Sequence, residues 1–317
     1  MGETIAFPEG WQRAVKLGEA ALAKKDYQKA VAYFEDAYRQ RPTYPIHRRL
    51  LTALEKVGGY KQALAAAADH QADYDHDPEG FAQLFRLLLL DQQYLAAKTY
   101  LVRAQRQGWL TDDVVKVRQE ELALLEKQQL FYDPDLPVIK KTVLSRLNGN
   151  FKAIPQKNWE DWVQGLTTDR FVRIAESVLE QAHNPFLRPR LVEELLKLGV
   201  AKRIKIRDLE GNVRECQLAE IELPEADPAL LEMLRYLEAE HGHEDPTILP
   251  LIAGEIQGHF ALSFPFSPQR EDPEGWAESY WLEYQAAIGA ADPAVLNPFA
   301  EIQKIKARYR ELLAGLY

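Results

Sequence analysis

The chain has 317 residues and a formal net charge of −9, with 46% hydrophobic and 27% charged residues. This balance is ordinary for folded globular proteins and excludes a wholly disordered chain. No apolar run approaches the roughly 18 residues of a membrane-spanning helix. The first residues lack the basic and apolar segments of a signal peptide, and the single cysteine, Cys216, excludes intrachain disulfides and cysteine-based zinc sites. We therefore expect a cytoplasmic protein.

A spaced pattern recurs three times in the first third of the chain. In each copy a tyrosine is followed three residues later by an alanine, as in Tyr27 and Ala30, Tyr60 and Ala63, and Tyr94 and Ala97. The interval of about 34 residues is typical of stacked helix–turn–helix units. A small residue at a helix crossing lets the two helices approach closely. The pattern therefore predicts nested helix pairs.

The first copy is the most complete, and the third adds two further matches. Residues that extend the pattern are Leu17, Gly18, Phe34, Ala37 and Pro42 in the first copy, and Leu101 and Ala104 in the third. Over residues 8–107 the chain resembles the tetratricopeptide repeat (TPR) family. It departs from that family at Ala21, where an aromatic residue is usual. A further helix over residues 112–128 should cover the end of the stack, because an exposed last face needs a cap.

The resemblance implies that the repeats bind a protein or peptide along a concave groove lined by the first helix of each repeat. By position in the repeat, the lining residues would be Gln12, Val15, Glu19 and Leu22, then Arg48, Thr52 and Glu55, then Ala82, Arg86 and Leu89. Glu19 would repel a C-terminal carboxylate, which argues against partners recognised by that group. The alternative is that some of these side chains pack against the neighbouring domain.

The second half begins after two prolines at residues 134 and 137, which break any helix. We therefore expect one domain over 1–131 and another over 137–317. Four Asp-Pro pairs, each placing a capping carboxylate ahead of a first-turn proline, predict helix starts at residues 227, 245, 272 and 292. A last helix is expected over 299–316, with Ile302, Ile305, Tyr309 and Leu312 on one face.

One stretch of the second half alternates charged and apolar residues as a half-buried strand does. It predicts a β-hairpin near 202–219, preceded by a helix over 185–198 that ends before Gly199. The predicted fold class is therefore all-α: a stack of TPR-type helical hairpins, then a second, mostly helical domain with one β-hairpin. The whole pattern also looks like uncharacterised TPR proteins of Gram-positive bacteria, a likeness that supplies no activity.

The helix and basic hairpin also suggest a nucleic-acid-binding regulator of winged-helix type using residues 187–207. Residues 137–207 carry 14 basic and 7 acidic side chains. The candidate phosphate contacts are Arg188, Arg190, Lys197, Lys202, Arg203, Lys205 and Arg207. However, residues 208–301 carry 3 basic and 20 acidic side chains, which would repel nucleic acid. We favour pairing between the two blocks inside one domain, which makes nucleic acid the less favoured partner.

Motifs for catalysis are missing from the sequence: it has no phosphate-binding loop, dinucleotide fingerprint, nucleophile elbow or His-Glu-x-x-His. The segment from His241 to Asp245 contains His-x-His without a third ligand at a defined spacing, which favours a polar helix end over a metal site. Cys216 lies on the expected hairpin as a packing residue. We therefore expect no enzyme, cofactor, metal, membrane or small-molecule substrate, but an adaptor for an unidentified protein or peptide.

Overall fold

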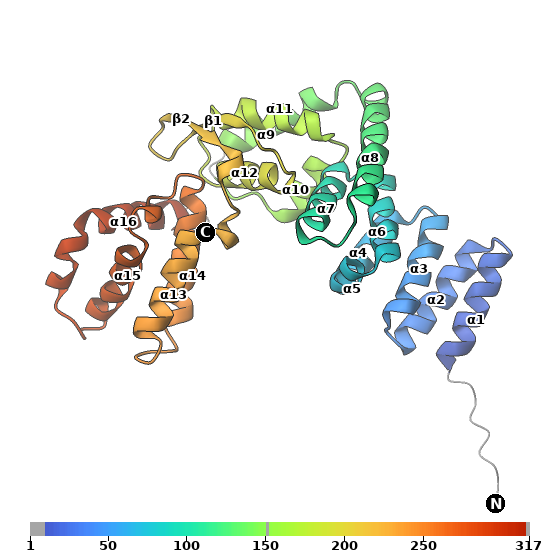
Figure 1. Cartoon of the computed structure of the whole chain (residues 1–317), viewed down its shortest axis with the longest axis horizontal. Helices are drawn as coiled ribbons and strands as arrows, with labels where there is room; N and C mark the ends of the chain where they lie inside the picture. The colour runs from blue at the N-terminus through green and yellow to red at the C-terminus, as the bar shows by residue number, and fades with distance from the viewer. Residues whose placement is uncertain (1–9, 150–151, 315–317) are drawn as a thin grey trace, which may run out of the picture. The chain divides into compact units, whose positions relative to one another are not determined.

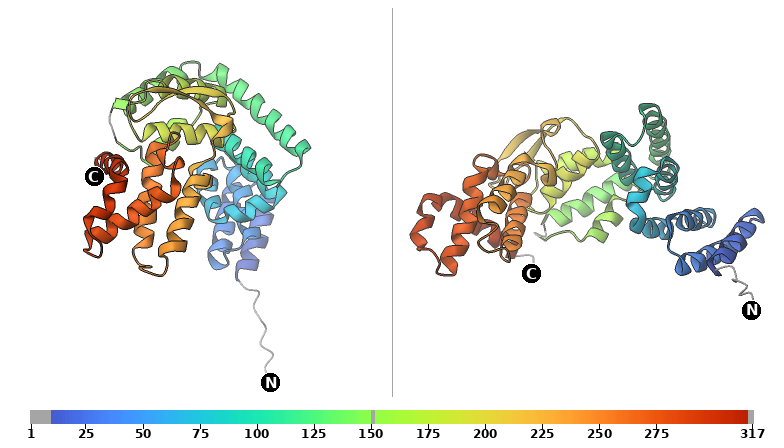
Figure 2. Two further views of the ribbon diagram at one scale, coloured as in Figure 1. Left: turned by 60° about the vertical axis from the view of Figure 1, so that its left-hand side comes forward. Right: turned by 60° about the horizontal axis from the view of Figure 1, so that its bottom comes forward.

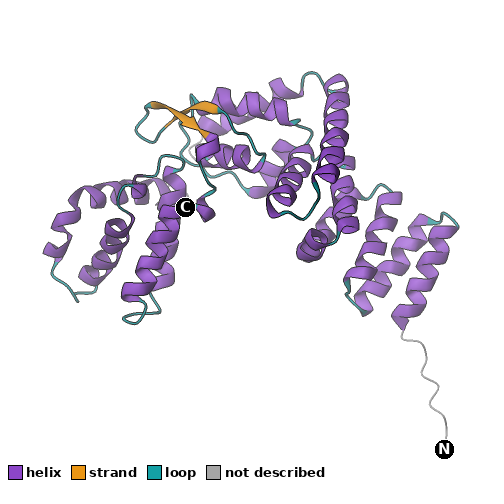
Figure 3. Ribbon diagram, in the orientation of Figure 1, coloured by secondary structure: helices purple, strands orange, loops and turns teal. Residues whose placement is uncertain are grey.

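The computed structural model describes residues 10–149 and 152–314, and the regular secondary structure within them is helical apart from one two-stranded hairpin (Figures 1 and 3). This confirms the predicted fold class. The chain forms two compact units: residues 1–134 with 163–168, and residues 135–162 with 169–317. The predicted limits of 1–131 and 137–317 leave out the short return of the chain at 163–168.

The first unit is a stack of helices in which consecutive helices pack on one another, as the blue to green ribbons in Figure 2 show. The first pair is α1 and α2, the second α3 and α4, and the third α6 and α7, with α8 at the end. Their bounds are α1 Gly10–Ala23, α2 Tyr27–Gln40, α3 Tyr44–Lys56, α4 Tyr60–Ala67, η1 Ala68–His70, α5 Gln71–His76, α6 Pro78–Leu90, α7 Tyr94–Gln107 and α8 Asp112–Tyr132.

Close packing of α1 on α2 depends on small residues. Ala30, Phe34 and Ala37 are 0% exposed. A Cβ added at Gly18 would lie 2.7 Å from the nearest Phe34 ring atom, so only glycine fits there. Leu17, by contrast, is 39% exposed, because α1 is the first described helix and no earlier described helix covers its outer side. Leu17 therefore does not belong to the buried core of the first repeat.

The second repeat differs from the first in its second helix, which stops at Ala67 and continues as the short segments η1 and α5. This break accompanies a buried aromatic cluster. Tyr74 on α5 is 0% exposed, its ring lies edge-on to Tyr44 at 5.0 Å, and its hydroxyl is 3.2 Å from Nδ1 of His47. The His47 and His70 rings are 4.6 Å apart. His70 and Tyr74 are four residues apart and lie on the same side of this segment, so both reach the cluster.

The helix at the end of the stack, α8, runs to Tyr132 and is longer than the predicted 112–128. Val115, Leu122 and Gln129, seven residues apart, form its buried face. The chain returns to this unit at 163–168. There Thr168 donates from its backbone N and its Oγ1 to Oε1 of Glu126, at 2.6 and 2.7 Å.

The second unit contains the remaining helices and the hairpin, in which Arg203 lies opposite Gln217 and Arg207 opposite Val213. Ile204, Ile206 and Cys216 are its buried side chains. The bounds are α9 Leu136–Gly149, α10 Gln156–Val163, α11 Thr168–Leu179, α12 Leu187–Lys197, β1 Arg203–Arg207, β2 Val213–Gln217, η2 Leu218–Glu220, η3 Pro224–Ala226, α13 Pro228–His241, α14 Leu249–Ser263, η4 Pro268–Arg270, α15 Pro273–Ala287, η5 Pro293–Phe299 and α16 Ala300–Ala314.

Three of the four predicted Asp-Pro helix starts are confirmed. Asp227 accepts from the amide of Ala229, Asp272 from that of Gly275 and Asp292 from that of Ala294. These carboxylates cap α13, α15 and the 3₁₀ helix η5, respectively. Each cap satisfies an amide that has no partner inside the helix.

The prediction at residue 245 is wrong, because α14 begins four residues later, at Leu249. Asp245 instead accepts from the amide and hydroxyl of Thr247, which closes a local turn. Its other oxygen accepts from the Tyr284 hydroxyl at 2.8 Å, which ties the turn to α15. The last helix, α16, runs from Ala300 to Ala314, because Phe299 still belongs to η5; residues 315 and 316 of the predicted 299–316 lie outside the described residues.

Candidate functional site

The strongest candidate site is a hollow of about 380 Å³ in the first unit. It lies along the first helices of the second and third repeats and the helix that ends the stack, so α3, α6 and α8 each contribute side chains. The lining residues are Arg48, Thr52, Glu55, Ala82, Gln83, Arg86, Arg118 and Glu121. We call this hollow the groove.

Five of the residues predicted to line a groove meet in this hollow: Arg48, Thr52, Glu55, Ala82 and Arg86. The four predicted on α1 do not line it. Val15 and Leu22 pack against the hydrophobic core, while Gln12 and Glu19 are exposed. Oε1 of Glu19 accepts from Nε of Arg49 at 3.0 Å.

The prediction that Leu89 lines the groove is wrong, because Leu89 is 4% exposed and belongs to the core. The helix that carries it, α6, packs against α4, α5 and α7. Leu87 and Leu88 are buried as well. The equivalent position faces the groove in the second copy, at Glu55, but is covered in the third copy.

The repeat pattern does not point to Gln83, Arg118 or Glu121. Nε2 of Gln83 donates to the Arg48 carbonyl at 3.1 Å and to Oγ1 of Thr52 at 3.0 Å, so it joins α6 to α3. Arg118 and Glu121 form a 2.7 Å pair on α8. The i, i+3 spacing of opposite charges could have indicated that pair, but the place of α8 after the last repeat predicts only a cap.

The groove is built from paired charges. Arg48 donates to Asp77 at 2.8 Å and to Glu79 at 3.4 Å, and Arg86 pairs with Glu55 at 2.8 Å. Burial alone would raise the pKa of Asp77, but hydrogen bonds from Tyr44 and backbone amides, together with Arg48, lower it on balance. Because arginines and carboxylates alternate across neighbouring helices, the surface offers both donors and acceptors.

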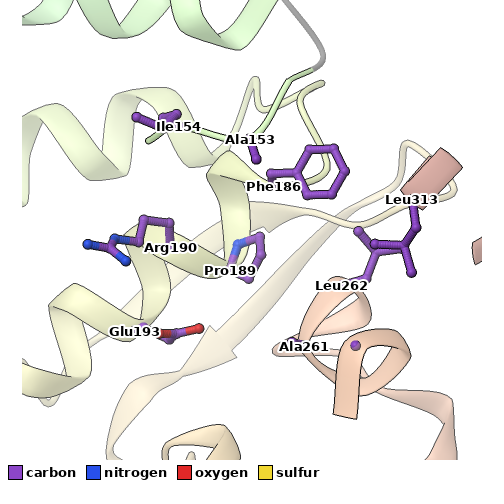
Figure 4. Close-up of a pocket in the computed structure, with 10 residues that line it drawn as sticks. Ala153, Ile154, Phe186, Pro189, Arg190, Glu193, Ala261, Leu262 and Leu313 are labelled. Carbon is purple, nitrogen blue, oxygen red and sulfur yellow. The ribbon is translucent and has the colours of Figure 1, made fainter. Parts of the chain in front are cut away.

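A second hollow, of about 300 Å³, lies in the second unit beside α12, α14 and α16 (Figure 4). Apolar side chains such as Phe186, Leu262 and Leu313 line it, with Arg190 and Glu193 from α12. Arg190 donates to Oε1 of Gln156 at 2.7 Å. Among the described residues that line this hollow there is no histidine, cysteine, serine or lysine, the side chains usual for nucleophilic or general-base chemistry.

Most basic side chains of the block proposed for nucleic acid already form hydrogen bonds or ion pairs with other groups of the second unit. Arg188 is 3% exposed and donates to the carbonyls of Phe264 and Leu262, so its assignment as a phosphate contact is wrong. Burial lowers the pKa of Arg188 to about 10. The neighbouring cations Lys197, Lys202 and Arg203 pair with Glu193, Glu176 and Glu215, while Arg207 donates to backbone carbonyls and Lys205 is exposed.

His241 has a structural role. Its ring stacks on Trp281 at 4.4 Å, and its nitrogens lie 3.0 Å from Glu244 and 2.8 Å from Glu278, which joins α13 to α15. Across residues 10–149 and 152–314, no three side chains among His, Cys, Asp and Glu are arranged to hold a metal ion. Burial raises the pKa of Cys216 to about 11, so the thiol is a poor nucleophile.

A buried ionic network joins α14, α15 and α16. Lys306 is 0% exposed, pairs with Glu283 at 2.5 Å and donates to the Ser279 carbonyl at 3.1 Å. Arg310 binds both Glu283 and Glu255 at 2.6 Å. None of these residues lines either hollow described above.

Comparison with known proteins gives one informative likeness. No family model matches the chain. The chain is similar to the TPR repeat-containing protein YsoA of Bacillus subtilis (strain 168), with 22% identity over 293 residues, which cover 86% of this chain and 83% of that protein. The likeness supports a TPR-like relationship. In the described part of the chain, no helix combines the length and apolarity needed to cross a bilayer.

Proposed function

We propose that this protein is a non-enzymatic cytoplasmic adaptor that binds another protein through the groove of its N-terminal repeats. The observation that carries the proposal is the meeting of five spaced residues in one hollow, from Arg48 on α3 to Arg86 on α6. Equivalent positions of successive repeats can line one surface only if the repeats stack, and consecutive helices of the first unit do pack on one another. The likeness to a TPR repeat-containing protein supports the same kind of role.

The groove is suited to a partner of mixed polarity. Arg48 is fixed by Asp77 and Gln83, and Arg86 by Glu55, so these side chains lose little freedom on binding. A strongly acidic partner would meet a carboxylate beside every arginine that attracts it. A strongly basic partner would likewise meet an arginine beside every carboxylate. We therefore expect a partner with both signs of charge, and no preference for acidic tails.

A swap of charges tests the groove without removing an ion pair. Glu55→Arg combined with Arg86→Glu keeps the α3–α6 contact but inverts the charges that the groove presents. The matched control combines Asp75→Arg with Arg103→Glu, which inverts a 2.8 Å pair whose members do not line the groove. In an affinity purification with mass spectrometry, the groove swap should reduce the recovered partner about tenfold, a loss of roughly 1.4 kcal/mol.

The control swap should leave the recovery of the partner unchanged, and both variants should keep the unfolding temperature of the native protein within a few degrees. Equal recovery with the groove swap and with the native protein would contradict binding at the groove. Equal loss in both variants would mean that the loss does not come from the groove, and would also contradict the proposal.

The alternative, a nucleic-acid-binding regulator, is disfavoured by the burial of Arg188 and by the carboxylate partners of Lys197, Lys202 and Arg203. Binding through phosphates would weaken steeply with salt. Binding to mixed-sequence DNA at low salt is the simplest assay, and we expect none to be detected.

A further inference from the structure

The helix α16 packs on the second unit through a face that is only partly apolar. Within this fully described helix the buried side chains are Lys306 and Tyr309, and Ile302 and Ile305 are partly buried against the core. The neighbouring helix α15 buries a larger apolar and aromatic face, which includes Trp276, Ala277, Tyr280 and Trp281. Because apolar burial is the main favourable term that holds a helix in place, α16 should be held less firmly than α15.

Ion pairs replace part of the missing apolar contact. Lys306 pairs with Glu283 on α15 at 2.5 Å, and its Nζ lies 4.0 Å from the centre of the Tyr280 ring. Arg310 pairs with Glu255 on α14 and with Glu283, at 2.6 Å in each case. Both cations of these pairs belong to α16, and both carboxylates belong to the helices on which it packs. We call these four charged side chains the seam.

The seam should contribute little net free energy to the closed position of α16. Lys306 is 0% exposed, so its ammonium group has lost the water that would solvate it. The cost of removing charges from water offsets much of their attraction, and replacing a buried ion pair by apolar side chains is often neutral or stabilising. When α16 leaves, all four charges return to water and regain that solvation.

The remaining contacts of α16 also allow it to leave. Arg308 donates to the Leu209 carbonyl and pairs with Glu210 at 3.3 Å, in the turn between β1 and β2. The side chains of Arg308 and Glu210 are 48% and 57% exposed, so water competes for this contact. The 3₁₀ helix η5, which leads into α16, has no buried side chain. Movement at η5 therefore withdraws no buried side chain from the core.

The position of Leu313 gives this movement a consequence. Leu313, on the last turn of α16, lines the hollow of about 300 Å³ together with Leu262 and Phe186 (Figure 4). A Cβ added at Gly258 of α14 would lie 4.0 Å from Cδ1 of Leu313, so the two helices are close at this point. Departure of α16 would remove one apolar wall of the hollow and expose the others to solvent.

We propose that α16 is a lid, which opens while the rest of the second unit stays folded and thereby uncovers the apolar hollow. The seam and the contact with the hairpin turn hold the lid closed. Salt favours the open state, because it stabilises charges that have separated in water. The inference concerns the second unit and goes beyond the proposed role of the groove.

Hydrogen–deuterium exchange of the full chain, read by mass spectrometry, tests the opening. The amides of α16 should exchange at least about tenfold faster than those of α15, because they are exposed by a local movement and not by unfolding of the unit. Raising sodium chloride from about 0.05 M to about 0.5 M should increase this ratio by about threefold or more. Equal exchange of the two helices, or a ratio that salt leaves unchanged, would overturn the proposal.

A paired substitution tests the seam itself. Lys306→Met combined with Glu283→Leu replaces one ion pair by apolar side chains of similar size and leaves Arg310 with Glu255. It should slow the exchange of α16 by about fivefold or more. The matched control, Lys202→Met with Glu176→Leu, removes an ion pair of the same unit that does not involve α16, and should leave that exchange unchanged. Equal or faster exchange in the seam variant, or equal slowing in the control, would contradict the role of the seam.

Thiol labelling tests whether the lid reaches the hollow. Leu262 is 3% exposed, so a cysteine introduced by Leu262→Cys should react with a maleimide mainly when α16 opens. The seam substitution should slow labelling at position 262 by the same factor as the exchange of α16. Cys216, which is 5% exposed and does not line the hollow, is the internal reference and should label at an unchanged rate. Labelling at position 262 that the seam substitution does not slow would overturn the proposal.

Discussion

Gly18 lies where α1 crosses α2, and the Phe34 ring occupies the space of its missing side chain, since a Cβ there would meet ring atoms at 2.7 to 2.9 Å. Phe34 is 0% exposed, so its ring lies in a packed interior where movement displaces neighbouring side chains. Alanine is otherwise the better helix former, by about 1 kcal/mol. The two effects therefore oppose each other at this position, and the steric contact should win.

We expect Gly18→Ala to destabilise the first unit by about 1 to 3 kcal/mol, the usual cost of overpacking a core. The control is Gly254→Ala on α14, where an added Cβ meets no described atom within 4 Å. That change should stabilise the protein by up to about 1 kcal/mol. Urea unfolding midpoints measure both. A Gly18→Ala protein as stable as the native one would show that the two helices do not pack closely here.

Individual residues differ in how well the sequence predicts them. Ala30, Ala63, Ala97 and Ala104 are all 0% exposed, as expected for residues at helix crossings. The prediction for Leu89 fails because its repeat position indicates the groove, whereas α6 is buried on several sides at this residue. Gln83 could not be found from spacing, since its role depends on two acceptors of another helix, the Arg48 carbonyl and the Thr52 hydroxyl.

At the scale of elements, one buried histidine in each unit joins neighbouring helices. His47 on α3 packs on His70 and Tyr74, and His259 on α14 lies 2.6 Å from the Tyr280 hydroxyl of α15. Both are 0% exposed. Burial lowers the pKa of each to about 4 from an ordinary value of 6.5. The folded protein therefore holds them neutral under conditions in which the unfolded chain protonates them.

This predicts a loss of stability in mild acid. Below about pH 6.5 the unfolded state binds protons that the folded state does not, so the free energy of unfolding falls as the pH drops towards 4. Between about pH 7.5 and 5 each histidine should cost about 2 kcal/mol. Unfolding midpoints at the two pH values measure the sum. His47→Gln and His259→Gln should each reduce the dependence, and a native protein equally stable at both pH values would contradict the prediction.

Helices are predictable where a local signal fixes their ends, and less so where packing does. Asp227 and Asp272 cap the helices that follow them because the carboxylate reaches an amide two or three residues ahead. The same signal fails at Asp245, since its oxygens are used by Thr247 and Tyr284. The break of the second repeat after Ala67 has no proline or glycine beside it in the sequence, so no local signal predicts it.

At the scale of the whole molecule, the sequence predicts a helical chain with one hairpin, and the structure has that fold. The prolines at residues 134 and 137 predict a single boundary between two domains. Residues 163–168 return to the first unit through hydrogen bonds between residues far apart in sequence, such as Thr168 with Glu126 and Gln164 with Asp91, and no local pattern indicates such contacts. Every described residue that lines the groove belongs to the first unit, so the proposed binding role concerns that unit alone.

The central claim is that the groove of the first unit meets another protein, and site-specific photo-cross-linking in cells tests it most directly. A benzophenone amino acid would replace Ala82, which lines the groove on α6, or Ala96, an exposed alanine on α7 of the same repeat. We predict a discrete protein adduct after irradiation from position 82 and none from position 96. No adduct from position 82, or the same adduct from both positions, would contradict the claim.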